Sequence, residues 1–391
     1  ARDLGVPVVL GSATPSLESW ANARAGRYVH LHLKHRARAD AALPAIELVD
    51  TGQEPTHGGL SPRVEQALRQ TLERGEQSLV FMNRRGYAPV LACAACGWVA
   101  MCSHCSAHVV FHKADGRMHC HHCGDVQRVP RACPTCGNQD LAPLGRGTQR
   151  IEETLTALLP TARLLRIDAD AVRHKNAAET MFARVHGGDV DVLIGTQMVA
   201  KGHDFERMSV VVVLGADAAL YSHDFRAPER LFQQLMQVAG RSGRAGKGGR
   251  VLVQTRYPKH PLFASLVVHD YARFAQTELL QREQARLPPY SYQAILRAES
   301  STLAEALRFL HEARHHALAL IGDGGVRVYD AVPMGLVRRA DVERAQLLVE
   351  SDTRSALQAF LPRWLAPFST RTVGREFNGV RWHIEVDPLE I

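Results

Sequence analysis

The sequence predicts an α/β protein whose parallel sheet is interrupted by a cysteine-rich insertion and followed by a separate α+β domain. Three observations support this fold class. From the first residues to about position 270, apolar and β-branched runs of strand length alternate with amphipathic helical stretches, which is typical of βαβ units. All eight cysteines lie between positions 93 and 136, where the apolar periodicity stops. After the Leu-Pro-Pro-Tyr stretch at 287–290, a new alternation of strands and a helix begins.

The elements can be placed along the chain from these patterns. We expect strands of the parallel sheet at residues 6–10, 78–82, 163–167, 190–194, 210–214 and 250–254. Amphipathic helices are expected between them, at 62–73, 149–159, 177–186 and 227–239. In the last domain, a helix at 302–320 lies among candidate strands at 293–298, 326–329, 346–350 and 381–386. A parallel sheet of this kind is covered by helices on both faces.

The composition is that of a globular protein large enough for two or three domains. Of its 391 residues, 46% are hydrophobic and 22% are charged. No apolar run approaches the roughly 20 residues of a membrane span, so we expect no membrane partner. The net charge of +7 suits a nucleic-acid partner but is also common among cytosolic proteins. The chain begins with Ala1 and shows no signal peptide, so we expect a cytoplasmic protein whose sequence starts within a longer polypeptide.

The cysteines form four Cys-x-x-Cys pairs, and the short turn that each pair forms is called a knuckle. These are Cys93/Cys96, Cys102/Cys105, Cys120/Cys123 and Cys133/Cys136. Each pair can present two thiolates to one ion, and two pairs complete a tetrahedral sulfur site of the kind that zinc prefers. Eight cysteines therefore predict two zinc ions. Gly97, Gly124 and Gly137 each follow the second cysteine of a pair, where the turn requires a positive φ angle.

Two schemes for grouping the pairs are open. Fourteen residues separate the second pair from the third, which is close to the spacing of a zinc ribbon. We therefore favour a nested scheme: the two inner pairs bind one zinc, and the two outer pairs bind the other. A sequential scheme would join the first two pairs across only five residues. Disulfides, unligated thiols and histidine ligands are the remaining alternatives, the histidines being His104, His119, His121 and His122. Because all-cysteine sites leave no open position, both zinc ions are expected to be structural.

The insertion and its flank are also rich in basic and aromatic residues. They include Arg84, Arg85, Lys113, Arg117, Arg128 and Arg131, together with Trp98 and Phe111. Such a surface can neutralise phosphates and stack on bases. In the alternative interpretation, the aromatic side chains form a small core beside the metal sites.

Two segments that follow predicted strands carry residues suited to a nucleotide or a nucleic acid. The stretch 11–16, Gly-Ser-Ala-Thr-Pro-Ser, can link a nucleotide site to a neighbouring domain or simply cap a helix. In the stretch 195–205, Thr196 and Gln197 can donate to a DNA phosphate. Gly202 lets the backbone approach closely, and Asp204 can orient a ribose hydroxyl or a metal-bound water. An ordinary loop between a strand and a helix is the alternative for this second stretch.

A third segment, 237–244, ends a predicted helix and runs into a glycine-rich loop. Arg241 and Arg244 suit a triphosphate, because guanidinium groups neutralise the charge that develops on a transferred phosphoryl group. Gln237 can position the attacking water. The pair Gly246-Lys247 does not form a phosphate-binding P-loop, because the required glycine spacing is absent and another glycine follows the lysine.

In this order and spacing, the three segments resemble motifs III, V and VI of superfamily 2 helicases. Four further features extend the resemblance. They are the strand at 78–82 followed by Asn-Arg-Arg-Gly-Tyr, the four-knuckle insertion, the run 216–230 before the third segment, and the closing stretch 386–390. With these features the chain resembles the PriA family, the bacterial primosomal replication-restart DNA helicases, over essentially its whole length.

The resemblance implies an ATP-dependent helicase that moves 3′ to 5′ on DNA. Members of the family act at stalled forks and D-loops, bind single strands, and help to reload the replicative helicase. The resemblance further implies a RecA-like helicase lobe 2 with a double-zinc insertion, in which four cysteines hold each of two structural Zn2+ ions, and ATP with Mg2+ in the full-length parent. It implies DNA, single-stranded-DNA-binding protein and other primosome proteins as partners. We also expect a monomer associated with the bacterial nucleoid.

Roles for individual residues follow from the matching motifs. Arg241 and Arg244 would reach toward ATP from lobe 2, while Gly202 and Asp204 would touch the nucleotide. The residues expected at the DNA are Thr196, Gln197, Phe225 and Arg226. The predicted domains are the end of lobe 1 (1–25), an inter-lobe segment with the start of lobe 2 (26–91), the zinc insertion (92–139), the rest of lobe 2 (140–270) and a C-terminal domain (271–391).

The chain departs from the family at its start. It contains no P-loop and no Asp-Glu dipeptide, and the N-terminal DNA-binding regions of the family are absent. We therefore expect no ATPase activity from this polypeptide alone. The alternative from a different class is a non-catalytic zinc-ribbon DNA-binding module, which would leave Gln237, Arg241 and Arg244 without a role.

The C-terminal domain carries no catalytic constellation in its sequence. In the family, this domain helps to bind DNA and the acidic tail of single-stranded-DNA-binding protein. Arg338 and Arg339 mark a basic stretch. Arg354 and Gln358, an i, i+4 pair on a predicted helix, are candidates for binding that tail. A solvated helix face is the alternative.

Overall fold

The computed structural model divides the chain into two compact units. Unit 1 comprises Ala1–Gly86 and Arg146–Gln281, and unit 2 comprises Tyr87–Gly145 and Arg282–Ile391. The structure describes all residues except 1–4, 34–42, 84–89, 94, 113–115, 121–122, 145–147, 168–176, 197–198, 200–204, 206, 223, 244–247, 323–324, 370–376 and 391.

Unit 1 is built on a six-stranded sheet in the order β1-β11-β10-β2-β9-β8. The strands are β1 (Ala45–Asp50), β2 (Gln77–Met82), β8 (Leu164–Ile167), β9 (Val192–Gly195), β10 (Met208–Leu214) and β11 (Arg250–Thr255). Every neighbouring pair is parallel. After β2 the chain builds the β8 edge, returns to β9, and then adds β10 on the other side of β2. The strand order therefore reverses at β2, which is where open α/β sheets place ligand sites.

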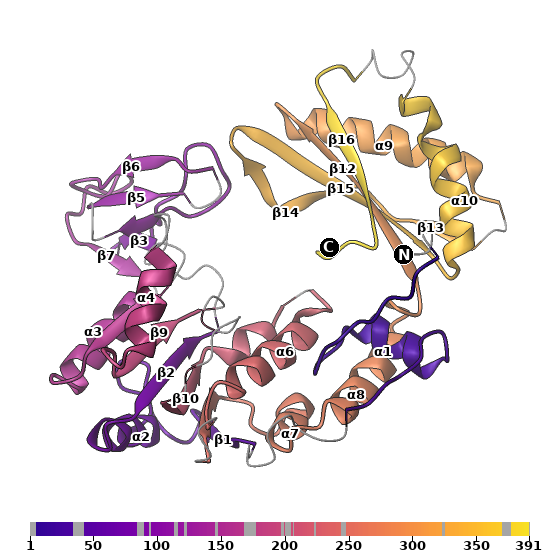
Figure 1. Cartoon of the computed structure of the whole chain (residues 1–391). Helices are drawn as coiled ribbons and strands as arrows, with labels where there is room; N and C mark the ends of the chain where they lie inside the picture. Colours follow the sequence, from indigo (N-terminus) through magenta and orange to yellow (C-terminus); the bar gives the residue numbers. More distant parts are fainter. Residues whose placement is uncertain are drawn as a thin grey trace. The chain divides into compact units, whose positions relative to one another are not determined.

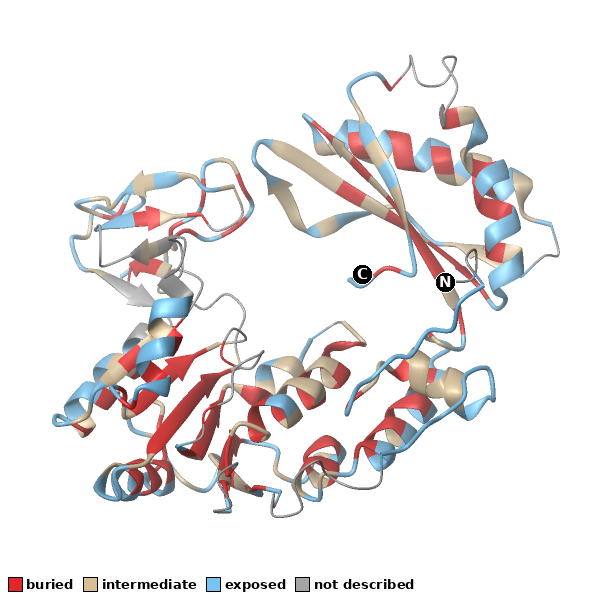
Figure 2. Ribbon diagram, viewed as in Figure 1, coloured by how far each residue is buried: buried red, intermediate tan, exposed pale blue. Residues whose placement is uncertain are grey.

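Helices cover both faces of this sheet, as Figures 1 and 2 show. On one face, α2 (Pro62–Glu73) and α3 (Thr148–Leu158) pack against Val80, Val210 and Val212. The other face is covered by α4 (Ala177–His186), α6 (Ala227–Ala239), α7 (Pro261–Val267) and α8 (Tyr271–Gln284). Consecutive residues of a strand point to opposite faces, so burial on both sides explains the continuous apolar runs in the sequence.

The structure of unit 1 differs from the sequence prediction in two places. The predicted strand at 6–10 is wrong, because the structure assigns no strand there and Val9 and Leu10 are 85% and 73% exposed. Within the described residues, this segment has no sheet partner, and a strand persists only when a neighbour satisfies its backbone groups. Conversely, β1 was not expected from the sequence, although it pairs with β11 over its whole length. Between these two segments lie α1 (Leu17–Arg24) and the partly described residues that follow it.

The cysteine-rich part of unit 2 forms a small antiparallel sheet in the order β6-β5-β4-β3-β7. Its short strands are β3 (Val90–Cys93), β4 (Val110–His112), β5 (Arg117–His119), β6 (Val126–Arg128) and β7 (Leu141–Leu144). The periodicity of the sequence does not show these strands, because three or four residues are too few to define a pattern.

The rest of unit 2 is an antiparallel sheet packed against helices. The sheet contains β12 (Tyr292–Ser300), β13 (Val326–Val328), β14 (Val332–Arg339), β15 (Val342–Ser351) and β16 (Arg381–Val386). Its core includes α9 (Leu303–Leu320), α10 (Arg354–Leu365) and the short 3-10 helix η2 (Ala366–Ser369). Phe309 is 1% exposed and contacts the rings of Phe368, Phe377 and Trp382. Trp364 is fully buried and donates its Nε1–H to the carbonyl of Ala313 at 2.8 Å.

The predicted fold class is confirmed: a parallel α/β sheet, a four-knuckle cysteine insertion and an α+β C-terminal domain. The compact units divide at Gln281, whereas the sequence places the start of the C-terminal domain at 271. The helix α8 covers this interval and packs Phe274 and Leu279 into the core of unit 1. Among the described residues, no helix combines the length and apolar character required to cross a membrane.

Candidate metal centres and nucleotide-binding segments

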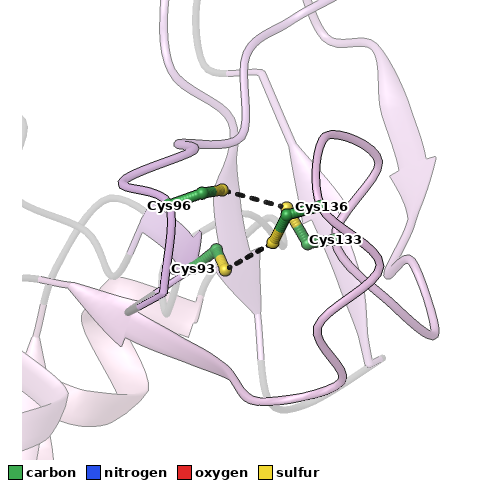
Figure 3. Close-up of side chains that lie close together, drawn as sticks. All are labelled: Cys93, Cys96, Cys133 and Cys136. Atoms are coloured by element: carbon green, nitrogen blue, oxygen red, sulfur yellow. Dashed lines mark hydrogen bonds between the residues drawn. The ribbon is translucent and has the colours of Figure 1, made fainter.

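The first cysteine cluster joins the first and last Cys-x-x-Cys pairs. Cys93, at the end of β3, and Cys96 face Cys133 and Cys136 from the loop between β6 and β7 (Figure 3). The Sγ atoms of Cys93 and Cys136 lie 3.6 Å apart, and those of Cys96 and Cys133 lie 3.5 Å apart. All four sulfur atoms lie within 4.8 Å of one another.

The second cluster joins the two inner pairs. Its members are Cys102, Cys105, Cys120 and Cys123, whose sulfur atoms also lie within 4.8 Å of one another. The Sγ atoms of Cys102 and Cys123 are 3.6 Å apart. Three of these four cysteines are buried, whereas the first cluster has two exposed members. The structure thus groups the pairs in the nested manner that the spacing favours.

The geometry of the donor atoms fits a metal rather than a disulfide. Sulfur atoms in a disulfide lie about 2.05 Å apart. A zinc ion with Zn–S bonds of about 2.3 Å separates tetrahedral sulfurs by roughly 3.8 Å, close to the distances in both clusters. A backbone hydrogen bond at Cys96 lowers the pKa of Cys93 to about 6, whereas burial raises the pKa of Cys102 to about 12. Four thiolates at such distances repel one another unless a cation compensates them, so each donor set suits a divalent ion.

The glycines after three of the four pairs adopt the backbone that the knuckle requires. Gly97, Gly124 and Gly137 have φ angles of 74°, 82° and 75°, which confirms the prediction. Each donates its N–H at 2.9 Å to the carbonyl of the first cysteine in its pair. A side chain in this left-handed conformation would be strained, so glycine is required by the turn itself.

For Trp98, the structure supports a place in a small core beside the metal sites. This side chain is half-buried and packs against the small core around the second cluster, which includes Leu91, Val109 and Met118. His104 belongs to neither cluster, and its Nδ1 lies 2.6 Å from a carboxylate oxygen of Asp341. Phe111 is half-buried, and Arg117, Arg128 and Arg131 are exposed. His119 is described but joins neither cluster; His121, His122, Arg84, Arg85 and Lys113 lie outside the described residues.

The segment predicted to contact DNA begins at the carboxyl end of β9. Thr196 follows the strand directly, and its carbonyl accepts a hydrogen bond from the amide of Val199 at 3.2 Å. A Cβ atom on Gly195 would lie 2.5 Å from a methyl group of Val199 and 3.0 Å from the carbonyl of Ile167. The glycine therefore allows this loop to close tightly over the sheet. Gln197, the second predicted phosphate contact, lies outside the described residues.

The segments predicted to contact the nucleotide meet at the amino end of β10. Phe205 accepts a hydrogen bond from the amide of Met208 at 3.3 Å, and the amide of Gly243 donates to Met208 at 3.1 Å. The structure thus brings the end of the stretch 195–205 beside the stretch 237–244. Gly202, Asp204 and Arg244 lie outside the described residues.

Two predicted catalytic residues lie at the end of α6 and just beyond it. Gln237 is exposed on the last turn of α6. Arg241 is half-buried and donates its amide to the carbonyl of Val238 at 3.0 Å. Both therefore belong to the same helix end, close to the amino end of β10.

The stretch 11–16 connects to α6 and α8 through residues outside the predicted sites. The buried carboxylate of Glu229 accepts the amide of Leu17 at 3.0 Å, at the start of α1. Gln233 donates to the carbonyls of Thr14 and Pro15 at 3.3 and 3.4 Å. The hydroxyl of Tyr271 also donates to Pro15. An acid and an amide four residues apart, and so on one face of the helix, were the available signal for this contact.

Phe225 and Arg226, which the sequence placed near the DNA path, contact each other and α1. The guanidinium of Arg226 lies 4.4 Å from the centre of the Phe225 ring. The same side chain is buried and donates to Glu18 of α1 at 3.1 Å. In this structure, Arg226 therefore links two protein segments, and its contact with DNA stays a prediction.

The candidates in the C-terminal domain lie on the surface. Arg354 and Gln358 are both exposed in α10. Arg354 lies over the ring of Tyr292 at 5.2 Å and 3.5 Å from a carboxylate oxygen of Asp387. These contacts orient the guanidinium without burying it.

The sheet and its insertion define a class of protein when they are compared with known families. Residues 146–246 match the helicase conserved C-terminal domain, so unit 1 contains a helicase C-terminal lobe. Residues 102–128 match the Cys-rich region domain of the PriA DNA helicase, and residues 283–389 match the primosomal protein N C-terminal domain.

Known relatives extend these matches over the whole chain. The replication restart protein PriA of Haemophilus influenzae is 39% identical over 401 residues, which cover 100% of this chain and 53% of the relative. The protein of the same name from Bacillus subtilis is 38% identical and covers 92% of this chain and 45% of the relative. The protein of the same name from Treponema pallidum is 36% identical, and the match covers 100% of this chain and 58% of the relative. The chain belongs to the PriA family, and it spans about half the length of the curated relatives it matches.

Proposed function

We propose that this chain forms the C-terminal part of an ATP-dependent 3′–5′ DNA helicase that acts in replication restart, at stalled forks and D-loops. One observation carries the proposal: a helicase C-terminal lobe and a four-knuckle cysteine insertion occur in one polypeptide, with the insertion directly after β2. The names of the relatives, replication restart protein PriA, support the same assignment.

Each cysteine cluster would hold one structural zinc ion. Cys93, Cys96, Cys133 and Cys136 would bind the first ion, and Cys102, Cys105, Cys120 and Cys123 would bind the second. Bound zinc supplies folding free energy to a module whose apolar core is too small to be stable alone. The closed sulfur shells leave no position for substrate, which supports a structural role.

The nucleotide and the DNA would use opposite ends of the sheet in unit 1. Arg241 and Arg244 would neutralise charge on the ATP phosphates, with Gln237 positioning the attacking water and Gly202 and Asp204 contacting the nucleotide. These segments adjoin the amino end of β10, as the hydrogen bond from Gly243 to Met208 indicates.

The DNA contacts would lie mainly at the carboxyl end of the sheet. Thr196 and Gln197 would donate to a phosphate, and Phe225 and Arg226 would border the path of the strand. The arginine would have to exchange its contact with Glu18 for one with DNA. Binding energy from a phosphate can offset the loss of this partly buried ion pair.

We further propose that Arg354 and Gln358 bind the acidic tail of single-stranded-DNA-binding protein. Both side chains are exposed on α10, and the guanidinium is already oriented over the ring of Tyr292. Other primosome proteins would be further partners of a monomeric, cytoplasmic protein associated with the nucleoid. Arg354→Glu should abolish binding of the tail peptide, whereas Arg363→Glu, nine positions further along the same helix, should not. Unchanged affinity of the first variant would refute this assignment.

Measurements on the chain and on its full-length parent test the helicase proposal. The chain alone should contain two zinc ions, bind forked DNA in a salt-dependent manner, and hydrolyse no ATP. In the full-length parent, Arg241→Ala should reduce DNA-stimulated ATPase by roughly 10³-fold or more, because an arginine that stabilises charge on the transferred phosphoryl group contributes about 10³–10⁵-fold in GTPases. Arg184→Ala, at an exposed position of α4, is the matched control. Unaltered ATPase in the Arg241 variant would favour the zinc-ribbon DNA-binding module instead.

A further inference from the structure

The second cysteine pair departs from the backbone pattern that the other three pairs share. In those three, the residue after the second cysteine is a glycine whose amide donates back to its own knuckle. At Cys102/Cys105 this position holds Ser106, and its amide donates instead to the carbonyl of Arg338 at 2.8 Å. The acceptor comes from the C-terminal domain, 232 residues along the chain.

The same replacement occurs at the sulfur atom of Cys105. In the first cluster, Cys96 and Cys136 receive hydrogen bonds from backbone groups of their own knuckles, at Trp98 and Asn138. Cys105 receives its backbone hydrogen bond from Ala340, whose N–H lies 3.2 Å from Sγ. The backbone hydrogen bond to Cys105 therefore comes from the C-terminal domain, whereas the corresponding bonds to Cys96 and Cys136 come from residues two positions along the chain.

The donor lies at the tip of the hairpin formed by β14 and β15. Ala340 and Asp341 connect these strands and have φ angles of 51° and 61°. Two consecutive positive φ angles are the signature of the tight turn that matches the twist of a two-stranded ribbon. Aspartate tolerates a positive φ angle, but alanine does not favour it, so Ala340 adopts this conformation at a steric cost. Contacts at the tip must compensate this cost.

Further contacts connect this hairpin to the knuckle. The amide of Asp341 donates to the carbonyl of His104 at 2.9 Å. The amide of Arg338 donates to Ser106 Oγ at 3.1 Å, and its guanidinium donates to the carbonyl of Ser103 at 2.8 Å. The side chain of Leu336 packs against the small apolar core that contains Cys102 and Cys105.

We propose that the hairpin tip, residues 338–341, is the outer shell of the second metal site, so that metal binding there and docking of the C-terminal hairpin are coupled. The proposal rests on zinc binding by the second cluster. An N–H that donates to a thiolate ligand withdraws charge from it and fixes its orientation, and such partners change metal affinity by about 10–100-fold. Coupling is reciprocal, so metal in this site stabilises the docked hairpin by the same factor. The first cluster, which forms the corresponding bonds within its own knuckles, does not share this coupling.

Hydrogen exchange in two matched cysteine variants tests the coupling. Cys123→Ser disables the second site, and Cys136→Ser disables the first. In the zinc-loaded chain, amides of residues 338–341 should exchange about 10–100-fold faster in Cys123→Ser than in the native protein. In Cys136→Ser they should exchange at the native rate, and paired amides of β12 should be unaffected in both variants. Equal effects of the two variants on residues 338–341, or no effect of either, would overturn the proposal.

Zinc content separates this result from the proposed function. The native chain should hold two zinc ions and each variant one. A native chain without zinc would contradict zinc binding itself, whereas two ions with identical exchange in both variants would contradict only the coupling.

A second pair of variants tests the docked hairpin tip. Ala340→Pro removes the N–H and also disrupts the turn, because proline fixes φ at about −65°, whereas Ala340→Gly keeps the N–H and suits the positive φ angle. Zinc transfer to a chromogenic chelator should accelerate by about 10–100-fold for one of the two ions in Ala340→Pro, and for neither ion in Ala340→Gly. In the cadmium-113-substituted protein, only one of the two resonances should move in Ala340→Pro. Movement of both resonances, or of neither, would contradict a hairpin tip that acts on the second site alone.

Discussion

The close approach of Gly249 to the segment 237–244 makes a sharp prediction about unit 1. A Cβ atom at Gly249 would lie 2.6 Å from the amide nitrogen of Gly243 and 2.6 Å from both the carbonyl carbon and the hydroxyl of Ser242. Ser242 is 3% exposed, and its hydroxyl donates to the carbonyl of Ala239 at 3.1 Å. On the other side, the carbonyl of Gly249 accepts the amide of Ala45 at 2.8 Å, beside the pairing of β1 with β11. The backbone therefore cannot move away from one contact without disturbing the other.

Two opposing effects set the expected change in the stability of unit 1. Overpacking of a buried site costs about 1–3 kcal/mol when neighbouring backbone must shift. Replacing glycine with alanine also restricts the unfolded chain, which returns about 0.4–1 kcal/mol. We therefore expect Gly249→Ala to lower the free energy of unfolding of unit 1 by about 1–2 kcal/mol. For a domain of roughly 200 residues, this corresponds to a fall in Tm of about 2–8 °C.

Differential scanning calorimetry of the zinc-loaded chain measures the effect, with Gly248→Ala as the matched control. Gly248 is exposed, its φ angle lies outside the left-handed region, and an added Cβ atom would meet nothing within 4 Å. The control should be neutral or up to about 1 kcal/mol more stable, because only the effect on the unfolded chain remains. The transition of unit 2 should be unchanged in both variants. Equal stabilities of the two variants would refute the reasoning, because they would show that the stretch 242–249 yields to a methyl group at no cost.

Three further predictions concern single contacts. Glu229→Ala should speed hydrogen exchange at the amide of Leu17 by an amount corresponding to about 1–3 kcal/mol, since this buried N–H loses its acceptor, and Glu229→Gln should preserve most of the protection. Hydrogen bonds from Arg163 hold the pKa of Asp191 below its ordinary value. A lowered folded-state pKa contributes stability above the unfolded pKa and loses it as the pH falls below about 4, so Asp191→Asn should flatten the acid side of the stability curve. That effect should stay below about 1 kcal/mol because the arginine is half-exposed, and an unchanged acid limb in urea titrations would contradict it. Phe309→Ala should destabilise unit 2 by about 3–5 kcal/mol and leave unit 1 unchanged in calorimetry, because the ring is 1% exposed at the centre of an aromatic cluster; loss of both transitions would contradict two separate cores.

The elements that the sequence predicts well are those with a local physical signal. β10 and β11 were expected because apolar runs rich in valine are typical of strands that are buried on both faces. The cysteine pairs were expected because two residues between thiolates suit one tetrahedral ion. The segment at 6–10 has the same local signal as a buried strand, but the structure assigns no strand there. An apolar run shows that a segment can form a buried strand, but it does not show whether a neighbouring strand is present to pair with it.

The candidate residues of the helicase lobe show the same division. Their types and order in the sequence were enough to suggest the family, to which the whole-chain matches assign the chain. Their distribution in space was not predictable. Phe205 and Gly243 are both hydrogen-bonded to Met208 because both flank the amino end of β10, and the contact of Glu229 with Leu17 joins residues 212 positions apart.

By itself, the sequence determined that this protein has a parallel α/β lobe and four two-cysteine knuckles, because strand burial and metal geometry act over a few neighbouring residues. Only the tertiary structure decided which knuckle forms its hydrogen bonds with a distant part of the chain. Ser106 in place of a knuckle glycine was visible in the chain, but its partner at Arg338 was not. A backbone amide donates wherever folding places an acceptor, and that position depends on the docking of a hairpin more than 200 residues away.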